Sequence, residues 1–333
     1  MKFGPVPVGK AEGAVLAHSV AVGRGRLRKG RVLTAADVAA LQDAGLEQVI
    51  AAQPGAADVG EDVAARRLAL AVAGPGLEVT EAFTGRVNLL AQGPGVVQMN
   101  VAALEAVNAV HPMITIATVP PWQQMRQGGM VATIKIISYA VPEADLALAV
   151  AAAGDAAVAL CGPRLRRAAL IITEIPGGAG EKGRPAIEGR LAALNVALCE
   201  VVVVPHDIDA LETALRAVRS DLVLILTGSA TSDIDDVAPA ALRQAGGVVE
   251  RFGMPVDPGN LLFLGHMAGM QVIGLPGCVR SPALNGADWV LSRVVCGIPI
   301  TSADISAMGV GGLLKEIPTR PQPRRGIKPG GQM

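Results

Sequence analysis

The sequence has few aromatic residues and no excess of either charge. Phe, Trp and Tyr make up 2% of its 333 residues, and 29 Lys and Arg residues are balanced by 29 Asp and Glu residues. Proteins that bind single-stranded nucleic acid use aromatic side chains as stacking platforms, and nucleic-acid-binding proteins generally carry a basic surface. The composition therefore argues against nucleic acid and against an anionic membrane surface as partners.

Long apolar runs and a signal peptide are also missing. The longest near-apolar stretch, 146–160, is interrupted by Gly154 and Asp155 and is too short to span a bilayer. The first ten residues lack the apolar core of a signal peptide. We therefore expect a cytoplasmic protein.

The cysteines are few and widely separated. No close pair occurs among Cys161, Cys199, Cys278 and Cys296, so neither a zinc ribbon nor a dithiol motif is supported. Cys161 and Cys199 lie in apolar stretches, and we expect both to be small core residues.

The length suits two domains with tails. We expect an α+β region over 1–160, a second domain over 165–300 and a C-terminal extension over 301–333. The extension is rich in Pro, Gly and basic residues, which predicts disorder from about residue 318.

The stretch Asp221–Ala241 carries the clearest functional signal. The apolar run 222–226 has the composition of a strand buried on both faces, and it breaks at Thr227-Gly228-Ser229. A segment of hydroxyls and carboxylates follows, and an Ala-rich helical pattern resumes after Pro239. Strand, loop and helix in this order place polar groups at the carboxyl edge of a parallel sheet, where α/β proteins bind ligands.

Three carboxylates lie in that loop, at Asp233, Asp235 and Asp236. Carboxylates beside a phosphate-sized turn suggest a divalent cation, or an anionic ligand bridged by one. The alternative is a solvated acidic loop in which Asp236 only caps the following helix.

Several motifs in order resemble one fold family. The pattern T-G-G-T-G-x-x-x-R-D-V-T-P of molybdopterin adenylyltransferases lies on Thr227–Pro239 without a gap. Its matching positions are Thr227, Gly228, Asp236, Val237 and Pro239, whereas Ser229, Ala230, Thr231, Asp235 and Ala238 depart from it. Upstream lie a strand at 167–176, a helix at 188–198, a strand at 200–204 and then Pro205-His206-Asp207, where His206 takes a position that is usually acidic. Downstream, 253–260 and the Gly-Leu-Pro-Gly loop 274–277 resemble molybdotransferase loops.

Residues 167–297 are therefore similar to the molybdopterin-binding fold of molybdopterin molybdotransferases and adenylyltransferases. They are closest to molybdopterin-binding proteins related to the N-terminal part of nucleotidyltransferase fusions. The resemblance implies an α/β fold with a mostly parallel sheet and flanking helices. The string K-G-x-x-L-T-x-x-D at Lys29–Asp37 is distantly molybdotransferase-like, and we expect a helix after Thr34.

The resemblance implies molybdopterin binding in molybdenum cofactor biosynthesis, as in molybdate insertion by a transferase. Asp233 and Asp236 would then be the catalytic and Mg²⁺-binding residues. The terminal phosphate of the pterin would lie at a loop that comprises Thr227, Gly228, Ser229, Thr231 and Ser232. Further ligand-binding residues would be Glu174, Asp207, Gly259, Asn260, Pro276, Gly277 and Arg280.

The implied ligands are molybdopterin, Mg²⁺ and, for insertion, molybdate. The implied partners are a nucleotidyltransferase or a molybdoenzyme, and we expect a homo-oligomer. Two alternatives stay open: a non-catalytic molybdopterin carrier, and an enzyme that transfers a nucleotide to the pterin. The run P-x-x-x-x-S-x-M-D-G-[YF]-A of molybdotransferases is missing, which argues against a complete insertion enzyme.

Overall fold

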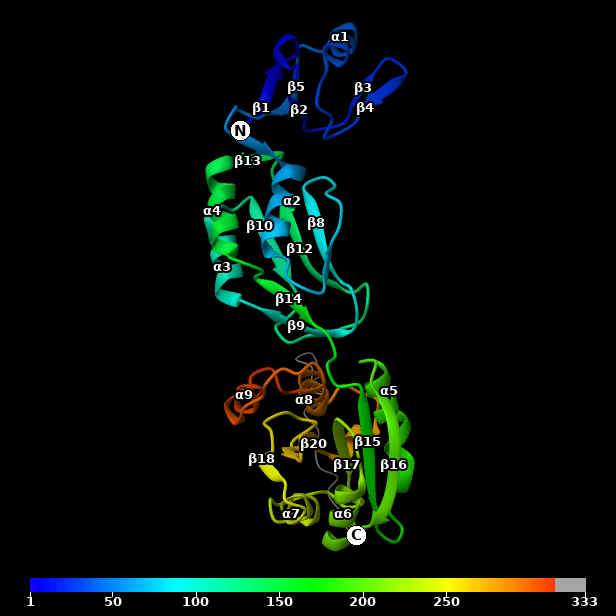
Figure 1. The fold of residues 1–333 in the computed structure, drawn as a ribbon. Coiled ribbons are helices and arrows are strands. Elements are labelled where there is room, and N and C mark those ends of the chain that lie inside the picture. Colours follow the sequence, from blue (N-terminus) through cyan, green and yellow to red (C-terminus); the bar gives the residue numbers. More distant parts are fainter. Residues whose placement is uncertain (315–333) are drawn as a thin grey trace, which may run out of the picture. The chain divides into compact units, whose positions relative to one another are not determined.

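The computed structural model describes residues 1–314, which fold into two compact units (Figure 1). The first unit comprises Met1–Gly93 and Val97–Cys161, and the second comprises Pro94–Val96 and the described residues from Gly162 to Leu314. The predicted disorder from about residue 318 falls outside the described residues. Among residues 1–314, no helix is long and apolar enough to cross a membrane.

The N-terminal part of the first unit is a small antiparallel sheet of order β1-β5-β2 beside the hairpin β3-β4. Its elements are β1 (Lys2–Pro7), η1 (Val8–Lys10), β2 (Val15–Leu16), β3 (Val20–Val22), β4 (Gly25–Leu27), α1 (Ala35–Asp43) and β5 (Gln48–Gln53). The helix expected after Thr34 is confirmed as α1. A capping box begins it, because the Thr34 hydroxyl accepts from the Asp37 amide and the Asp37 carboxylate accepts from the Thr34 amide.

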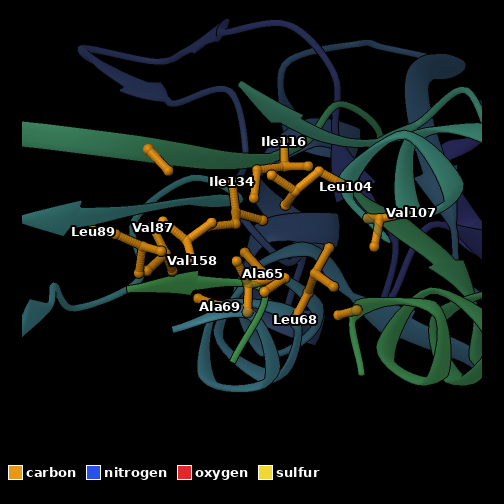
Figure 2. Close-up of a cluster of buried hydrophobic side chains, with 14 of the residues drawn as sticks. Ala65, Leu68, Ala69, Val87, Leu89, Leu104, Val107, Ile116, Ile134 and Val158 are labelled. Atoms are coloured by element: carbon orange, nitrogen blue, oxygen red, sulfur yellow. The ribbon is translucent and has the colours of Figure 1, made fainter. Parts of the chain in front are cut away.

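The rest of the first unit packs helices against short sheets, of which the largest has the order β10-β12-β8-β7. Figure 2 shows its core, where Leu68 of one helix meets Leu89 and Ile134 of two strands. The elements are β6 (Asp58–Gly60), α2 (Glu61–Val72), β7 (Leu77–Val79), β8 (Arg86–Ala91), β9 (Gly95–Met99), α3 (Val101–Val110), β10 (Ile114–Thr118), β11 (Gln124–Met125), β12 (Met130–Ile136), β13 (Ala140–Pro142), α4 (Glu143–Ala153) and β14 (Val158–Cys161).

The second unit contains a six-stranded sheet within the described residues, of order β16-β15-β17-β20-β19-β18. Strands β16, β15, β17 and β20 run parallel, and β19 pairs antiparallel with both β20 and β18. This arrangement confirms the expected α/β class. The elements are β15 (Arg167–Glu174), η2 (Gly180–Gly183), α5 (Arg184–Ala192), β16 (Ala197–Pro205), α6 (Ile208–Ala217), β17 (Leu222–Leu226), α7 (Val237–Gln244), β18 (Val248–Phe252), β19 (Phe263–Met267), β20 (Met270–Leu275), η3 (Gly277–Arg280), α8 (Gly286–Val295) and α9 (Ser302–Ala307).

Helices cover both faces of this sheet, which explains the unbroken apolar run of β17. Leu222, Leu224 and Leu226 pack on the face that α5 and α8 cover. Val223 and Ile225 point to the opposite face, among side chains of α6 and α7. Because successive side chains of a strand alternate between faces, a central strand covered on both sides must be apolar throughout.

The expectations for the helix before the edge strand β16 and for the burial of Cys161 and Cys199 were wrong. The helix expected over 188–198 ends at Ala192, because Asn195 adopts a left-handed conformation (φ 55°) and the chain turns into β16. Leu194 and Val196 are buried in this turn, so the apolar residues that suggested a longer helix belong to the turn. Cys199 was expected in the core but is exposed, since β16 is the outermost strand, and Cys161 is only partly buried.

Candidate functional site

The carboxyl ends of the parallel strands gather the predicted site residues at one edge of the second unit. Strands β15, β16, β17 and β20 end there at Glu174, Pro205, Leu226 and Leu275. Glu174 ends β15, and β16, β17 and β20 lead into loops that carry the other predicted ligand-binding residues of this edge. The parallel register therefore brings together segments that are about a hundred residues apart in sequence.

A buried hydroxyl at the end of β15 joins three of these loops. Thr173 is fully buried, and its Oγ1 accepts a hydrogen bond of 3.0 Å from the Gly228 amide. The same hydroxyl shares a hydrogen bond of 2.7 Å with Nδ1 of His206. Sequence reasoning did not include Thr173 or His206 among the site residues. The signals were present, as a hydroxyl inside the apolar run of β15 and a histidine at a usually acidic position.

We expect Thr173→Val to destabilise the protein, although valine has nearly the same shape. The substitution leaves the Gly228 amide and the His206 ring without their partner in a buried place, which costs about 1–3 kcal/mol for each unsatisfied group. Chemical denaturation monitored by circular dichroism measures the change. Thr173→Ser restores the hydroxyl and should recover most of the stability; equal loss in both variants would show that the methyl group matters instead.

The loop between β17 and α7 offers unused backbone donors. Thr227 and Thr231 are buried, and their hydroxyl oxygens lie 3.4 Å apart, so the two side chains close the base of the loop. Within residues 1–314, no hydrogen bond uses the amides of Ser229, Ala230 or Thr231. Successive amides without a partner among the described residues, beside hydroxyl groups, can donate to a phosphate or a similar oxyanion.

Asp236 holds the end of this loop. One carboxylate oxygen accepts from the Val237 amide at 2.7 Å and caps α7, and the other accepts from the Ser232 amide at 2.9 Å. Burial raises the pKa of Asp236, but these two amides and the charge of nearby His206 outweigh burial, so the pKa lies below its usual value. The carboxylate is therefore ionised at neutral pH and is occupied in shaping the loop.

The other loop carboxylates do not converge with Asp236. Asp233 accepts from the Asp235 amide at 2.8 Å, and Asp235 pairs with Arg243 at 2.7 Å. In the described part of the chain, no group of three or more His, Cys, Asp or Glu side chains could hold a metal ion. Asp233 and Asp236, the expected Mg²⁺ ligands, each accept from backbone amides of their own turn, as short acidic side chains commonly do.

Arg280 connects the loop after β20 to the other loops. Its guanidinium donates to the carbonyl oxygens of Thr227 at 2.9 Å and Gly180 at 3.0 Å. Burial lowers the pKa of Arg280, although an arginine keeps its charge at neutral pH. Arg280 thus brings a positive charge beside the free amides and simultaneously fixes the loop that holds them.

Glu174 and Asp207 also lie at this edge but are exposed. The carbonyl oxygen of Glu174 accepts from the His206 amide at 3.0 Å, which ties the ends of β15 and β16 together. Asp207 accepts from the Ala210 amide at 2.8 Å and is the N-cap of α6. The Asp207 side chain, which the resemblance assigned to ligand binding, is therefore occupied in capping α6.

The remaining predicted residues lie in two other loops. Gly259 packs so closely on the start of α8 that a Cβ atom would lie 3.0 Å from the Gly286 backbone. Asn260 donates to the Met254 carbonyl oxygen at 3.3 Å, which closes the turn between β18 and β19. Pro276 and Gly277 begin the loop after β20. No hydrogen bond within residues 1–314 joins Gly259 or Asn260 to 227–236.

Comparisons with known proteins match two parts of the chain to family models. Residues 154–294 match the family model "Probable molybdopterin binding domain", and residues 5–53 match "Domain of unknown function (DUF8806)". No curated protein matches the chain.

Three of the solved structures that show similarity illustrate its extent. MoaB, a molybdopterin biosynthesis enzyme from Thermus thermophilus, is 22% identical, with 46% of this chain and 100% of that chain covered and a TM-score of 0.31. The molybdopterin biosynthesis protein MoeA from Pyrococcus horikosii is 14% identical, with 89% and 75% covered and a TM-score of 0.30. CinA from Thermoplasma acidophilum, described as of unknown function, is 19% identical, with 35% and 90% covered and a TM-score of 0.27.

These structural likenesses are too weak to support a statement about function. The family model is more informative, because it spans the strands β15, β16, β17 and β20 and their loops. The resemblance inferred from the sequence motifs is thus confirmed, and residues 154–294 form a domain of the molybdopterin-binding fold family.

Proposed function

We propose that this sheet edge binds molybdopterin through its terminal phosphate, as a step in molybdenum cofactor biosynthesis. The observation that carries the proposal is the row of unused amides at Ser229, Ala230 and Thr231, directly after a central parallel strand. Backbone amides in such a loop bind anions without a specific side chain, so the replaced glycines of the family pattern need not abolish binding.

The surrounding residues would take distinct parts in binding. Arg280 would offset the charge of the phosphate, and Asp236 would hold Ser232 so that the preceding amides stay oriented. Gly259, Asn260, Pro276 and Gly277 would form the walls on the pterin side. Glu174 and Asp207, both exposed, would line the outer rim.

Mg²⁺ would enter together with the phosphate. One oxygen each of Asp233 and Asp235 carries no hydrogen bond within residues 1–314, but Asp235 is already paired with Arg243, which leaves Asp233 as the better carboxylate ligand. Magnesium in proteins commonly takes one or two carboxylates and completes its shell with phosphate oxygens and water. Asp233 would therefore position the ion, and electrostatic stabilisation by the ion would supply the catalysis in a molybdate-insertion reaction.

The scattered carboxylates favour a second candidate function, a non-catalytic molybdopterin carrier. A carrier needs the phosphate-binding loop but no converging acidic groups, which fits the described residues. Release of AMP from adenylylated molybdopterin, measured with molybdate and Mg²⁺ present, separates the two candidates. AMP release in multiple turnovers supports the insertion enzyme, whereas tight binding of molybdopterin without release supports the carrier.

We expect Asp236→Ser to weaken molybdopterin binding at least about tenfold while the protein stays as stable as wild type. Serine is an N-cap nearly as good as aspartate, so α7 should begin normally. A single hydroxyl cannot also hold the Ser232 amide, and the loop then loses its fixed shape. A tenfold loss corresponds to about 1.4 kcal/mol, a lower bound below the roughly 2.7–4 kcal/mol that the loss of one preorganised donor costs.

Isothermal titration with purified molybdopterin and a thermal melt provide the two readouts. Asp236→Ala is the matched control, because it loses the cap as well and should cost about 0.5–2 kcal/mol of stability. Unchanged molybdopterin affinity in Asp236→Ser would remove Asp236 from the binding loop.

A further inference from the structure

A second cavity lies at the opposite edge of the same sheet. It has a volume of about 600 Å³, within the range of cavities that take small organic ligands. It lies where β15, β17 and β20 begin and β19 ends, whereas the proposed pterin site lies where the parallel strands end. Its lining consists of Arg167, Arg216, Arg219, Ser220, Asp221, Ala245, Met267, Ala268 and Met270.

The charges around this cavity are unequal. Three guanidinium groups face one carboxylate, and that carboxylate, of Asp221, already accepts from the Arg166 and Arg167 amides at 3.0 and 3.1 Å. Asp221 is therefore committed to joining the starts of β15 and β17. The lining keeps a positive excess, although Glu212 just outside it pairs with Arg216.

Two of the arginines are held in place by neighbouring helix ends. One nitrogen of Arg219 donates hydrogen bonds to the carbonyl oxygens at the end of α6. Arg216 pairs with Glu212 and donates to the Gln244 carbonyl oxygen at the end of α7. These contacts neutralise the negative helix ends and fix the guanidinium groups. Each guanidinium has five N–H donors, so several stay available for a ligand.

A buried hydroxyl in the lining lacks a partner. The Oγ atom of Ser220 is inaccessible to solvent and makes no hydrogen bond within the described residues. Buried polar atoms in native proteins are nearly always paired, so this hydroxyl indicates a missing acceptor or donor. Met267 and Met270 are buried beside it and add an apolar, adaptable wall.

We propose that this cavity binds a small phosphate-bearing ligand with an apolar part, such as a nucleoside diphosphate. Fixed arginines recognise phosphate oxygens, and the methionine wall accepts a flat apolar group. The strand β17 separates the two sites by about 16 Å, five residues at roughly 3.3 Å each. A ligand here would therefore occupy the protein together with the pterin and could couple to it through β17.

Inorganic pyrophosphate, ADP and adenosine are the probes that test the proposal. We expect pyrophosphate and ADP to bind, ADP more tightly, and adenosine to bind at least about tenfold more weakly than ADP, because ionic hydrogen bonds carry most of the affinity. Amide chemical shifts in the full-length protein locate the ligand. Shifts are expected at Ser220, Ala268 and Gly269.

Arg167→Gln should lower ADP affinity about tenfold, since it removes one charge from the lining. Arg166→Gln is the matched control, because Arg166 is the exposed neighbour outside the lining and should change affinity less than about twofold. Ser220→Ala should weaken ADP binding without lowering the melting temperature of the free protein. Equal losses in the two arginine variants, or no binding of any probe, would overturn the proposal.

The chemical shifts also separate this proposal from the pterin site. Shifts confined to Ser229, Ala230 and Thr231 would show phosphate at the carboxyl edge only, which overturns the second site and supports the phosphate-binding loop. Shifts confined to Ser220, Ala268 and Gly269 support the second site even if molybdopterin does not bind at the carboxyl edge.

Discussion

Replacing Arg190 by methionine should reduce the stability of the second unit by about 3–5 kcal/mol, the range for removing one partner of a buried ion pair. Arg190 lies on α5 with 11% of its side chain exposed and pairs with Asp288 at 2.5 Å. It also donates to the carbonyl oxygens of Val279, Ser281 and Ala283 in the loop after β20. Methionine fills the space but leaves Oδ1 of Asp288 and these carbonyl oxygens without their donor, and Asp288 keeps the Asn285 amide on its other oxygen.

Thermal and urea denaturation measure the loss, with roughly 2–4 °C expected per kcal/mol for a unit of this size. Arg184→Met is the matched control on the same helix. Arg184 pairs with Glu181 and Glu188 on the surface, where ion pairs contribute about 0–1 kcal/mol. A similar loss in both variants would mean that helix propensity or net charge, and not the buried network, determines the effect of Arg190.

Gly228→Ala should abolish molybdopterin binding and destabilise the protein by about 1–3 kcal/mol, as overpacking of a rigid place does. A Cβ atom at Gly228 would lie 2.7 Å from the Thr173 carbonyl oxygen and 3.1 Å from the Ile175 amide nitrogen. Both are backbone atoms of β15 and its loop, so neither can rotate away. The start of the phosphate-binding loop must then move, and the bond from its amide to the Thr173 hydroxyl is lost.

Gly277→Ala provides the control for stability. Gly277 begins the loop after β20, and its added Cβ would meet no atom within 4 Å. A glycine replaced where the backbone tolerates alanine changes stability little or raises it by about 0.4–1 kcal/mol. Denaturation curves of the two variants should therefore separate clearly; coincident curves would show that β15 and β17 can spread apart at little cost.

Arg190→Met and Gly228→Ala both affect loops that are held by buried polar contacts. Arg190 and Arg280 fix the loop after β20, and Thr173 fixes the loop after β17. A binding edge built in this way is rigid before its ligand arrives, which lowers the entropy lost on binding. We therefore expect loss of affinity to accompany loss of stability in most variants of these residues.

The sequence alone was sufficient for the fold class and for the loop at the carboxyl edge of the sheet. The apolar run 222–226 predicted a central strand, because only a strand covered on both faces is apolar at every position. The small residues and hydroxyls that follow it predicted a loop at the carboxyl edge of the sheet. Both depend on local composition and on the order of elements, which a single chain displays directly.

Only the tertiary structure decided how the polar groups of that edge are used. Asp233, Asp235 and Asp236 are neighbours in sequence, but their carboxylates turn to nearby amides and to Arg243 and do not converge on one point. Thr173 bonds to both His206 and Gly228 because three parallel strands end side by side. Ser220 and Arg167 line one cavity because the starts of β15 and β17 are neighbours at the opposite edge. Such contacts depend on strand register and side-chain direction across long sequence separations, which local patterns do not specify.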